Sequence, residues 1–193
     1  LFEDEMVIVI DKPAPLPVHA GGRFNRNTLQ YFLNEVYAPQ RPRPAHRLDA
    51  NTSGVMVIAR SRHSAGHLQS QFAQGRVEKV YHAKVVGHPK EDHFSCSVPI
   101  SSEPDECGSR RVDIQEGLEA LTEFKVLQRN SDGTSLVEAK PITGRTNQIR
   151  VHLWHLGFPI VGDLLYLANQ KLGKTQTQSM HDEPLCLRSV KVR

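Results

Sequence analysis

Short runs of apolar and alternating residues along the chain predict β-strands. These runs are Met6 to Ile10, Val55 to Ala59, Val77 to Val86 and Leu185 to Val192. The third run alternates with a period of two, so Tyr81, Ala83 and Val85 are expected on one face of their strand. The step Lys12-Pro13 is expected to end the first strand, because proline has no N–H to donate to a β-ladder.

Three segments have the amphipathic spacing of α-helices. The first of them places four residues on one face, namely Leu29, Phe32, Leu33 and Val36. Asn27 is its expected N-cap, because a short polar side chain can accept a hydrogen bond from the first turn. The second helix, Ser64 to Gln74, is expected to end at Gly75, and the third, Thr146 to Leu156, at Gly157.

Two further strands are predicted as a β-hairpin. Glu119 to Gln128 and Thr134 to Lys140 flank the turn Ser131-Asp132-Gly133. The polar stretch before them, residues 87–118, is irregular, with one possible strand near Phe94 to Ile100. Hairpins mixed with isolated helices favour an α+β fold with a largely antiparallel sheet, since the regular βα alternation of doubly wound folds is absent.

The length and composition are those of an ordinary globular protein. With 193 residues, the chain is expected to form one domain, residues 1–193, and it can bury a core without a disulfide or a structural metal. Hydrophobic residues make up 38% of the chain. The formal net charge is +3, and this mild excess permits a polyanionic partner without requiring one.

The cysteines and the apolar runs bear on the compartment. Cys96, Cys107 and Cys186 have no CxxC spacing, so we expect free thiols in a reducing compartment, the cytoplasm. No apolar run approaches the roughly 18 residues that a membrane span needs, and no signal peptide opens the chain. Leu1 is followed at once by strand-like sequence, so a native start and any targeting segment are expected to have been lost.

Several weak motifs favour ordinary structural roles. His152 and His155 lie three residues apart on a predicted helix, but no HExxH pattern accompanies them, so no metal site is expected. Gly21-Gly22 lacks both the GxGxxG pattern and a P-loop lysine, and Ser53 lacks the GxSxG elbow of acyl-transfer enzymes. A nucleotide cofactor and acyl transfer are therefore not expected.

Three longer segments contain more polar and ionisable side chains than these weak motifs. They are His46-Arg47-Leu48-Asp49 followed by Thr52-Ser53-Gly54, then Lys79-Val80-Tyr81-His82-Ala83, and last Gly144-Arg145-Thr146-Asn147-Gln148-Ile149-Arg150-Val151-His152. Taken singly, each has an ordinary structural interpretation. Asp49 suits a turn or a helix cap, Tyr81 a sheet, and Arg150 a helix surface.

Together, the three segments closely resemble the motifs of the RluA-type pseudouridine synthases. The patterns HRLD-x-x-TSG, K-x-Y-x-A and GR[ST]-x-Q-[IL]-R-V-H occur in the order that the family shows, and Asp49 and Tyr81 are separated as they are in the family. The opening strand with its Lys-Pro turn, and the block Gly157 to Asp163, are also similar to family segments. The resemblance therefore runs over nearly the whole chain.

The resemblance implies roles for four residues. Asp49 matches the catalytic aspartate, and Arg47 the arginine that helps to displace the target nucleotide from its stack. Tyr81 matches the tyrosine that lies against the flipped uracil, and Arg150 the arginine that pairs with the catalytic carboxylate. The implied fold is a mixed, mostly antiparallel sheet with flanking helices and a central RNA-binding cleft. The implied activity is the isomerisation of uridine in RNA, without a cofactor or metal.

The sequence departs from the family pattern at two places. Asn147 stands where the family usually has histidine, and Ala50-Asn51 occupies a variable pair inside the first motif. Neither departure falls on the four matched residues. The departures therefore bear on the substrate preference more than on the catalytic chemistry. Some relatives carry an accessory RNA-binding domain before the first strand, and none is expected within residues 1–193.

The chemistry of the reaction suits these residue types. The uracil–ribose C–N bond breaks, the base turns, and a C–C bond forms, so neither a redox change nor a group donor is needed. The carboxylate can attack the sugar carbon, or remove a sugar proton to give a glycal, and the sequence leaves both open. Base flipping is cheapest in loops, which favours structured single-stranded targets in tRNA or rRNA.

Two other functions remain as alternatives. One is a catalytically silent RNA-binding or RNA-folding protein on the same scaffold, against which the intact Asp49, Tyr81 and Arg150 argue. The other is an unrelated hydrolase that uses Asp49 and would release free uracil. The expected partner is a structured RNA stem-loop, with no membrane and no obligate protein partner, and the chain is expected to be a monomer.

Overall fold

The computed structural model describes residues 1–193 apart from 22–23, 107, 176 and 180. The described chain divides into two compact units. Unit 1 comprises residues 1–78 and 189–193, and unit 2 comprises residues 79–188. The expectation of a single catalytic domain stays a prediction.

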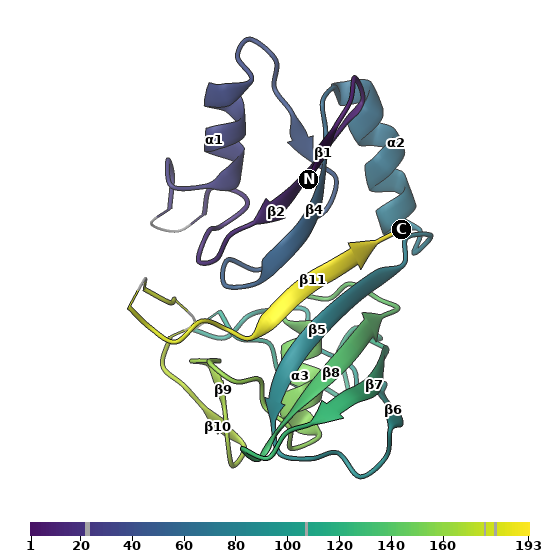
Figure 1. Ribbon diagram of the computed structural model, residues 1–193, viewed down its shortest axis with the longest axis vertical. Coiled ribbons are helices and arrows are strands. Elements are labelled where there is room, and N and C mark those ends of the chain that lie inside the picture. The colour runs from purple at the N-terminus through teal and green to yellow at the C-terminus, as the bar shows by residue number, and fades with distance from the viewer. Residues whose placement is uncertain (22–23, 107, 176, 180) are drawn as a thin grey trace. The chain divides into compact units, whose positions relative to one another are not determined.

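A small sheet forms the centre of unit 1 (Figure 1). Its strands are β1 (Phe2–Glu3), β2 (Val7–Lys12), β3 (Arg43–Pro44), β4 (Ser53–Ala59) and the unit 1 residues of β11 (Leu187–Val192). Strand β4 is central, since β2 pairs with it from Val7 to Lys12, and β3 pairs with its last two residues. The two apolar runs at the start of the chain therefore form neighbouring strands, as predicted. The two-residue strands β1 and β3 were not anticipated.

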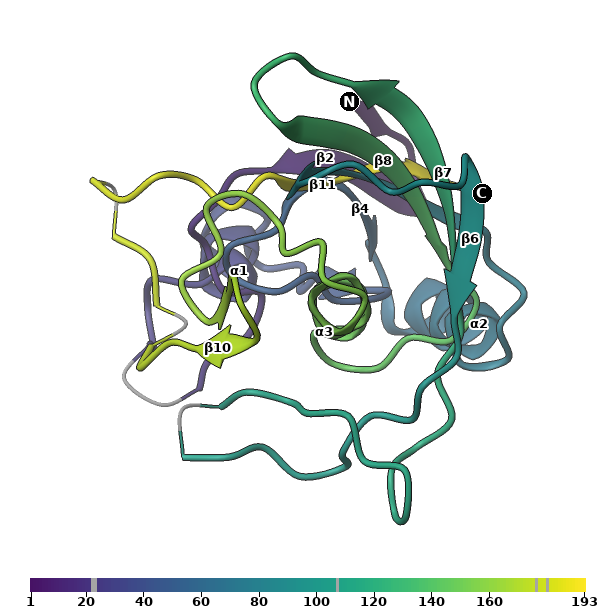
Figure 2. The ribbon, with the colours of Figure 1, turned by 90° about the horizontal axis from the view of Figure 1, so that it is seen from below.

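Two helices, α1 (Leu29–Val36) and α2 (Arg62–Ala73), lie on the same side of β2 and β4 (Figure 2). The N-cap of α1 is Thr28, whose hydroxyl accepts from the N–H of Tyr31, so the predicted Asn27 cap is wrong by one residue. Of the four residues expected on one face, Leu29 and Leu33 are buried, but Phe32 and Val36 are exposed. Only part of the apolar face of this eight-residue helix is thus buried.

The second helix begins and ends with recognisable caps. Ser61 is its N-cap and accepts from the N–H of Ser64. The helix stops at Ala73, and Gly75 adopts a φ of 67°, a left-handed conformation that favours glycine. The predicted end at Gly75 is confirmed, while the beginning lies two residues earlier than expected.

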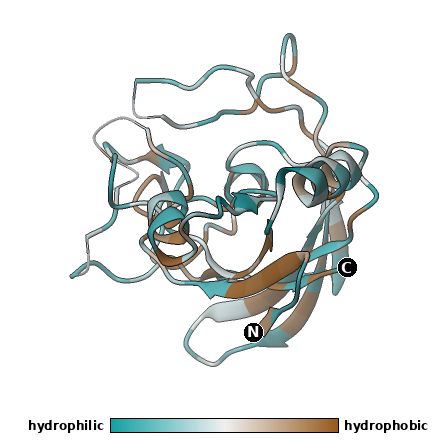
Figure 3. Cartoon of the chain, turned by 90° about the horizontal axis from the view of Figure 1, so that it is seen from above, coloured by the Kyte–Doolittle hydropathy of each residue, from teal (hydrophilic) through white to brown (hydrophobic). Residues whose placement is uncertain are grey.

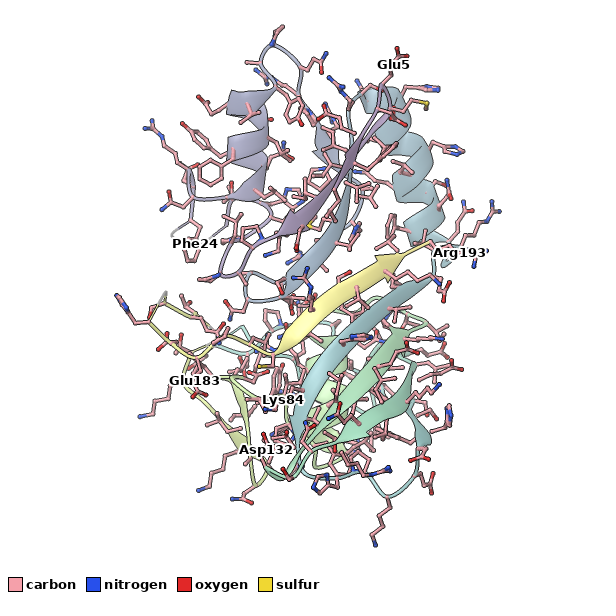
Figure 4. The ribbon with its side chains drawn as sticks, in the orientation of Figure 1. Glu5, Phe24, Lys84, Asp132, Glu183 and Arg193 are labelled. Atoms are coloured by element: carbon pink, nitrogen blue, oxygen red, sulfur yellow. The ribbon has the colours of Figure 1, made fainter. Side chains whose placement is uncertain are left out.

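Antiparallel strands in the order β5-β8-β7-β6 form the main sheet of unit 2. They are β5 (Lys79–Val86), β6 (His93–Cys96), β7 (Thr122–Arg129) and β8 (Thr134–Pro141). Strands β7 and β8 form the predicted hairpin. Beside its turn, Lys84 on β5 forms an ion pair with Asp132 at 3.0 Å (Figure 4). Hydrogen bonds from Thr134 and Lys84 lower the pKa of Asp132 to about 2.

Helix α3 (Gln148–His155) packs against β7 and β8. A buried cluster lies at this helix and consists of Ile100, Ala120, Val151, Leu165 and Tyr166. The helix ends before Gly157, as predicted, and begins two residues later than expected. Two further two-residue strands, β9 (Tyr166–Leu167) and β10 (Lys171–Leu172), pair with each other and were not anticipated.

The most hydrophobic stretches lie on the strands, while the helices carry much of the polar sequence (Figure 3). Tyr81, Ala83 and Val85 are all buried, which confirms the face predicted for this strand. The α+β class with antiparallel pairing is confirmed. No helix in the described part of the chain is long and apolar enough to cross a membrane.

Candidate active site

Asp49 lies in unit 1 on the loop that joins β3 to β4. Its side chain is half-buried, and the preceding Leu48 is buried in the core. The N–H of Thr52 donates to the backbone carbonyl of Asp49 at 3.1 Å, which closes a tight turn just before β4 begins. The backbone of Asp49 therefore belongs to a short turn that a hydrogen bond closes.

Lys12 holds this loop in place. Its side chain is completely buried, and Nζ donates to the carbonyls of Pro13, Leu16 and Ala50 at 2.8, 2.8 and 3.0 Å. Three acceptors match the three N–H groups of a charged ammonium. Burial lowers the pKa of Lys12 to about 8, against the opposing effect of the negative charge of Asp49. At neutral pH, Lys12 thus places a positive charge beside the loop of Asp49.

His46 holds the segment of this loop that precedes Asp49. Its Nε2 accepts a hydrogen bond from the N–H of Val57 on β4 at 3.1 Å, so the neutral ring carries its proton on Nδ1. The ring stacks on Phe72 of α2, with 4.5 Å between the ring centroids. Arg47, the next residue, is exposed, and its charge adds to desolvation in lowering the pKa of His19.

The backbone geometry explains why the last residue of the first motif, Gly54, is a glycine. Its φ is 112°, a conformation that L side chains rarely adopt. A Cβ at this position would lie 2.1 Å from the carbonyl oxygen of Ser189. The TSG end of the motif therefore allows β4 to approach the last strand closely.

Tyr81 and Arg150 belong to unit 2. Tyr81 is a buried residue of β5, paired in register with Ala139 of β8. Two residues earlier, Lys79 donates from Nζ to the carbonyl of Thr143 at 3.1 Å, and burial lowers the pKa of Lys79. This bond joins the second motif to the beginning of the third.

Gln148 holds the turn that opens the third motif. Its Oε1 accepts from the hydroxyl of Thr143 and from the N–H of Arg145, at 2.7 and 2.9 Å. Its Nε2 donates to Leu121 O and Thr122 Oγ1. All four bonds of the amide lie within unit 2, so the glutamine of the GR[ST]-x-Q pattern is a structural residue.

Arg150 is buried and forms a bidentate ion pair with Asp163. Its Nε and Nη2 donate to the two carboxylate oxygens at 2.7 and 2.8 Å. Asp163 also accepts from the N–H groups of Leu165 and Tyr166, so its carboxylate is held in turn. Arg150 is therefore not a helix-surface residue, and its guanidinium has a fixed orientation.

Asn147 lies in contact with Arg150, although it departs from the family pattern. Its Oδ1 accepts from Nη1 of Arg150 at 3.3 Å. The sequence placed this departure away from the four matched residues, and the structure shows that it directly contacts one of them.

The histidine that ends the third motif is a packing residue. His152 is fully buried, with Nδ1 at 3.0 Å from Thr122 Oγ1 and Nε2 at 3.1 Å from Val98 O. Burial is the main cause that lowers the pKa of His152. Both ring nitrogens thus have protein partners. In the described parts of the chain, no group of three or more His, Cys, Asp or Glu side chains is placed to hold a metal ion.

The structure thus assigns Asp49 and Arg47 to unit 1, and Tyr81 and Arg150 to unit 2. The pairing of Arg150 with Asp49 stays a prediction. Lys12, His46 and Asp163 were quoted in the sequence only as parts of motifs, with no role of their own. The burial of Lys12 was missed because lysine is rarely buried, and the sequence showed it only as the residue before the proline that ends the strand.

Comparison with known proteins agrees with these motifs. A sequence profile described as RNA pseudouridylate synthase matches residues 6–155. The human pseudouridylate synthase RPUSD2 is 39% identical over 86% of this chain, but the match covers only 30% of the human protein. The dual-specificity RNA pseudouridine synthase RluA of Yersinia pestis is 31% identical over 97% of this chain and 90% of its own length.

A solved structure shows the same architecture. The human RNA pseudouridylate synthase domain-containing protein 1 superposes with a TM-score of 0.80 at 28% identity, over 100% of this chain and 76% of that chain. The present chain spans less than a third of the human and mouse RPUSD2 proteins. With a family profile over most of its length and an RluA relative matched nearly end to end, the chain belongs to the RluA-type RNA pseudouridylate synthase family.

Proposed function

We propose that this chain isomerises uridine in RNA to pseudouridine, with Asp49 as the catalytic carboxylate. One observation carries the proposal. In a chain of this family, the half-buried Asp49 stands on a loop that the buried ammonium of Lys12 holds through Ala50. A carboxylate that is held in place and kept beside a positive charge is suited to act repeatedly as a nucleophile or base.

The reaction balances without any added reagent. The bond between the ribose C1′ and the uracil N1 breaks, the detached base turns, and C1′ bonds to C5 of the same base. The proton of C5 leaves, and N1 gains one. Asp49 either forms a bond with the sugar and is then displaced, or removes a sugar proton and later returns it. Both routes need an ionised carboxylate and a base that stays in its pocket.

The remaining matched residues take supporting roles in this proposal. The aromatic ring of Tyr81 holds the flat uracil by stacking while the base turns. Arg47, which is exposed on the same loop as Asp49, fills the space that the flipped nucleotide leaves or holds a phosphate. Arg150 orients the carboxylate of Asp49 with a guanidinium that Asp163 already aligns.

The proposed substrate is a structured RNA, a stem-loop of tRNA or rRNA, and the proposed active species is a monomer. Exposed basic residues of unit 1 support an RNA partner. Arg26, Arg41, Arg43 and Arg47 are exposed in unit 1, whereas Arg23 lies outside the described residues. Exposed arginines of this kind bind phosphates and make affinity depend on salt. Loop nucleotides cost less to flip than paired ones, which favours a stem-loop.

Tritium release tests the proposal. The purified chain is incubated with tRNA and rRNA stem-loop transcripts that carry tritium at C5 of uridine, and the digested RNA is analysed for nucleosides. We expect tritium release matched by an equal amount of pseudouridine. Free uracil in place of pseudouridine would identify a hydrolase. RNA binding without tritium release from any transcript would identify a silent RNA-binding protein.

A further inference from the structure

Tyr166 joins two parts of unit 2 through a fully used hydroxyl group. Its side chain is 1% exposed. The hydroxyl accepts from the backbone N–H of Arg110 and donates to the backbone carbonyl of the same residue, both at 2.8 Å. It also accepts from Nδ2 of Asn147 at 3.2 Å. A hydroxyl has one hydrogen to donate and two lone pairs, so these three bonds use its whole capacity.

The same tyrosine contacts Arg150 through its ring. The guanidinium carbon lies 4.9 Å from the ring centroid, which is within the range of a cation–π contact. Asn147 makes the second connection, because its Nδ2 faces Tyr166 and its Oδ1 faces Nη1 of Arg150. A guanidinium only donates, so this orientation of the amide is the one that satisfies both neighbours.

The backbone conformation of Asn147 is unusual for an N-cap residue. It is the N-cap of α3, yet its φ is 59° and its side chain makes no capping hydrogen bond. Asparagine at an N-cap ordinarily accepts from the first turn of the helix. Here the side chain is instead directed into the buried contacts with Tyr166 and Arg150, and asparagine tolerates the left-handed backbone that this requires.

We propose that Tyr166 and Asn147 are positioning residues for Arg150, and that they make its orientation depend on the docking of the backbone at Arg110. Asp163 aligns one edge of the guanidinium, Asn147 contacts Nη1, and the Tyr166 ring contacts one face. The hydroxyl bonds of Tyr166 then join this arrangement to the loop of residues 101–111, whose described residues are mostly exposed. The contribution to turnover rests on the proposed function, whereas the mechanical link does not.

The experiment measures the position of Arg150 directly and turnover separately. The ¹⁵N-edited signal of the Arg150 Nε–H, assigned by its loss in Arg150→Lys, gives the solvent-exchange rate of that proton. Tyr166→Phe removes only the hydroxyl and keeps the ring, and Asn147→Ala removes the bridge. Tyr31→Phe, on α1 in unit 1, is the matched control. Values of kcat and KM are measured for all variants on a responsive RNA transcript.

In Tyr166→Phe, we expect exchange at Arg150 Nε–H and at the Arg110 amide to rise at least about tenfold, and kcat to fall at least about fivefold with KM within about twofold. Asn147→Ala should raise exchange at Arg150 and leave the Arg110 amide nearly unchanged. Tyr31→Phe should change neither.

Unchanged exchange at Arg150 in both variants would overturn the link, whatever the enzyme does. Faster exchange at Arg150 with unchanged kcat would overturn the positioning role. If the unmodified chain turns over no RNA, the proposed function fails. The exchange rates then still decide whether Tyr166 and Asn147 hold Arg150.

Discussion

Nζ of Lys12 donates a hydrogen bond to the backbone carbonyl of Ala50, the residue immediately after Asp49, at 3.0 Å. The same ammonium binds Pro13 and Leu16, so one buried lysine closes the loop after β2 against the loop that carries Asp49. Burial of a lysine is unfavourable, and here it is offset by three carbonyl acceptors and by the charge of Asp49.

Lys12→Met should destabilise the protein. The substitution keeps a long unbranched side chain but leaves three backbone carbonyls without their donor, and it should lower the free energy of unfolding by about 1–3 kcal/mol. Urea unfolding followed by circular dichroism measures this change. Lys191→Met replaces an exposed lysine and should stay within about 0.5 kcal/mol of the unmodified chain. Equal stability of the two variants would show that the Lys12 bonds contribute little.

Gly54→Ala should destabilise the protein more than Gly133→Ala. Gly54 has a positive φ, and a Cβ added to it would lie 2.1 Å from a backbone carbonyl oxygen, so both strain and a clash result. Gly133 also has a positive φ, but no atom lies within 4 Å of its added Cβ. Gly133→Ala should cost about 1–2 kcal/mol, and Gly54→Ala clearly more. Similar unfolding midpoints for the two variants would rule out the close approach to Ser189.

The stability of the fold should fall in mild acid, partly through His152. Its pKa is lowered in the folded protein, so the unfolded chain binds the proton more readily. The stabilisation is therefore present above the ordinary histidine pKa of 6.5 and is lost as the pH falls below that value. His152→Asn should flatten the decline of the urea midpoint between about pH 7 and pH 5. His63→Gln, on the exposed side of α2, should leave the slope unchanged, and an equal slope in His152→Asn would exclude this residue as the cause.

Arg150→Lys should separate a positioning role from a purely structural one. Lysine keeps the charge but cannot form two parallel bonds with Asp163. If Arg150 orients the Asp49 carboxylate as proposed, kcat should fall at least about tenfold. A misaligned Asp49 carboxylate would raise the barrier by about 1.4 kcal/mol or more. RNA affinity should stay within about tenfold, as measured by filter binding. A normal kcat in a less stable variant would mean that Arg150 serves only its ion pair with Asp163.

The sequence predicted the sheet and the motifs better than the contacts between them. Strand runs such as Val77 to Val86 succeed because burial imposes a period of two that is visible in a single sequence. The cap of α1 was misplaced by one residue, since Asn27 and Thr28 are both good N-caps and only the tertiary structure selects Thr28. Phe32 and Val36 were placed on one face with Leu29 and Leu33, but nothing in the helical period says how much of that face the neighbouring elements will cover.

For the site residues too, the sequence identifies the motifs but not the contacts between side chains. Asp49, Tyr81 and Arg150 are found by motif, because each stands in a pattern with several fixed neighbours. The partner of Arg150 is not found in this way. Asp163 lies thirteen residues away beyond the end of α3, and only the fold brings its carboxylate to the guanidinium. Likewise, the contact of Asn147 with Arg150 depends on a left-handed backbone that no pattern of residue types reveals.

The catalytic role of Asp49 is tested most directly by the turnover of Asp49→Ala and Asp49→Asn beside the unmodified chain, on one RNA with tritium at C5 of uridine. We expect tritium release and pseudouridine from the unmodified chain, and none from either variant. Both variants should remain folded and bind the RNA within about tenfold of the original affinity, or about 1.4 kcal/mol. Measurable pseudouridine formation by Asp49→Ala would contradict the assignment of Asp49 as the catalytic carboxylate.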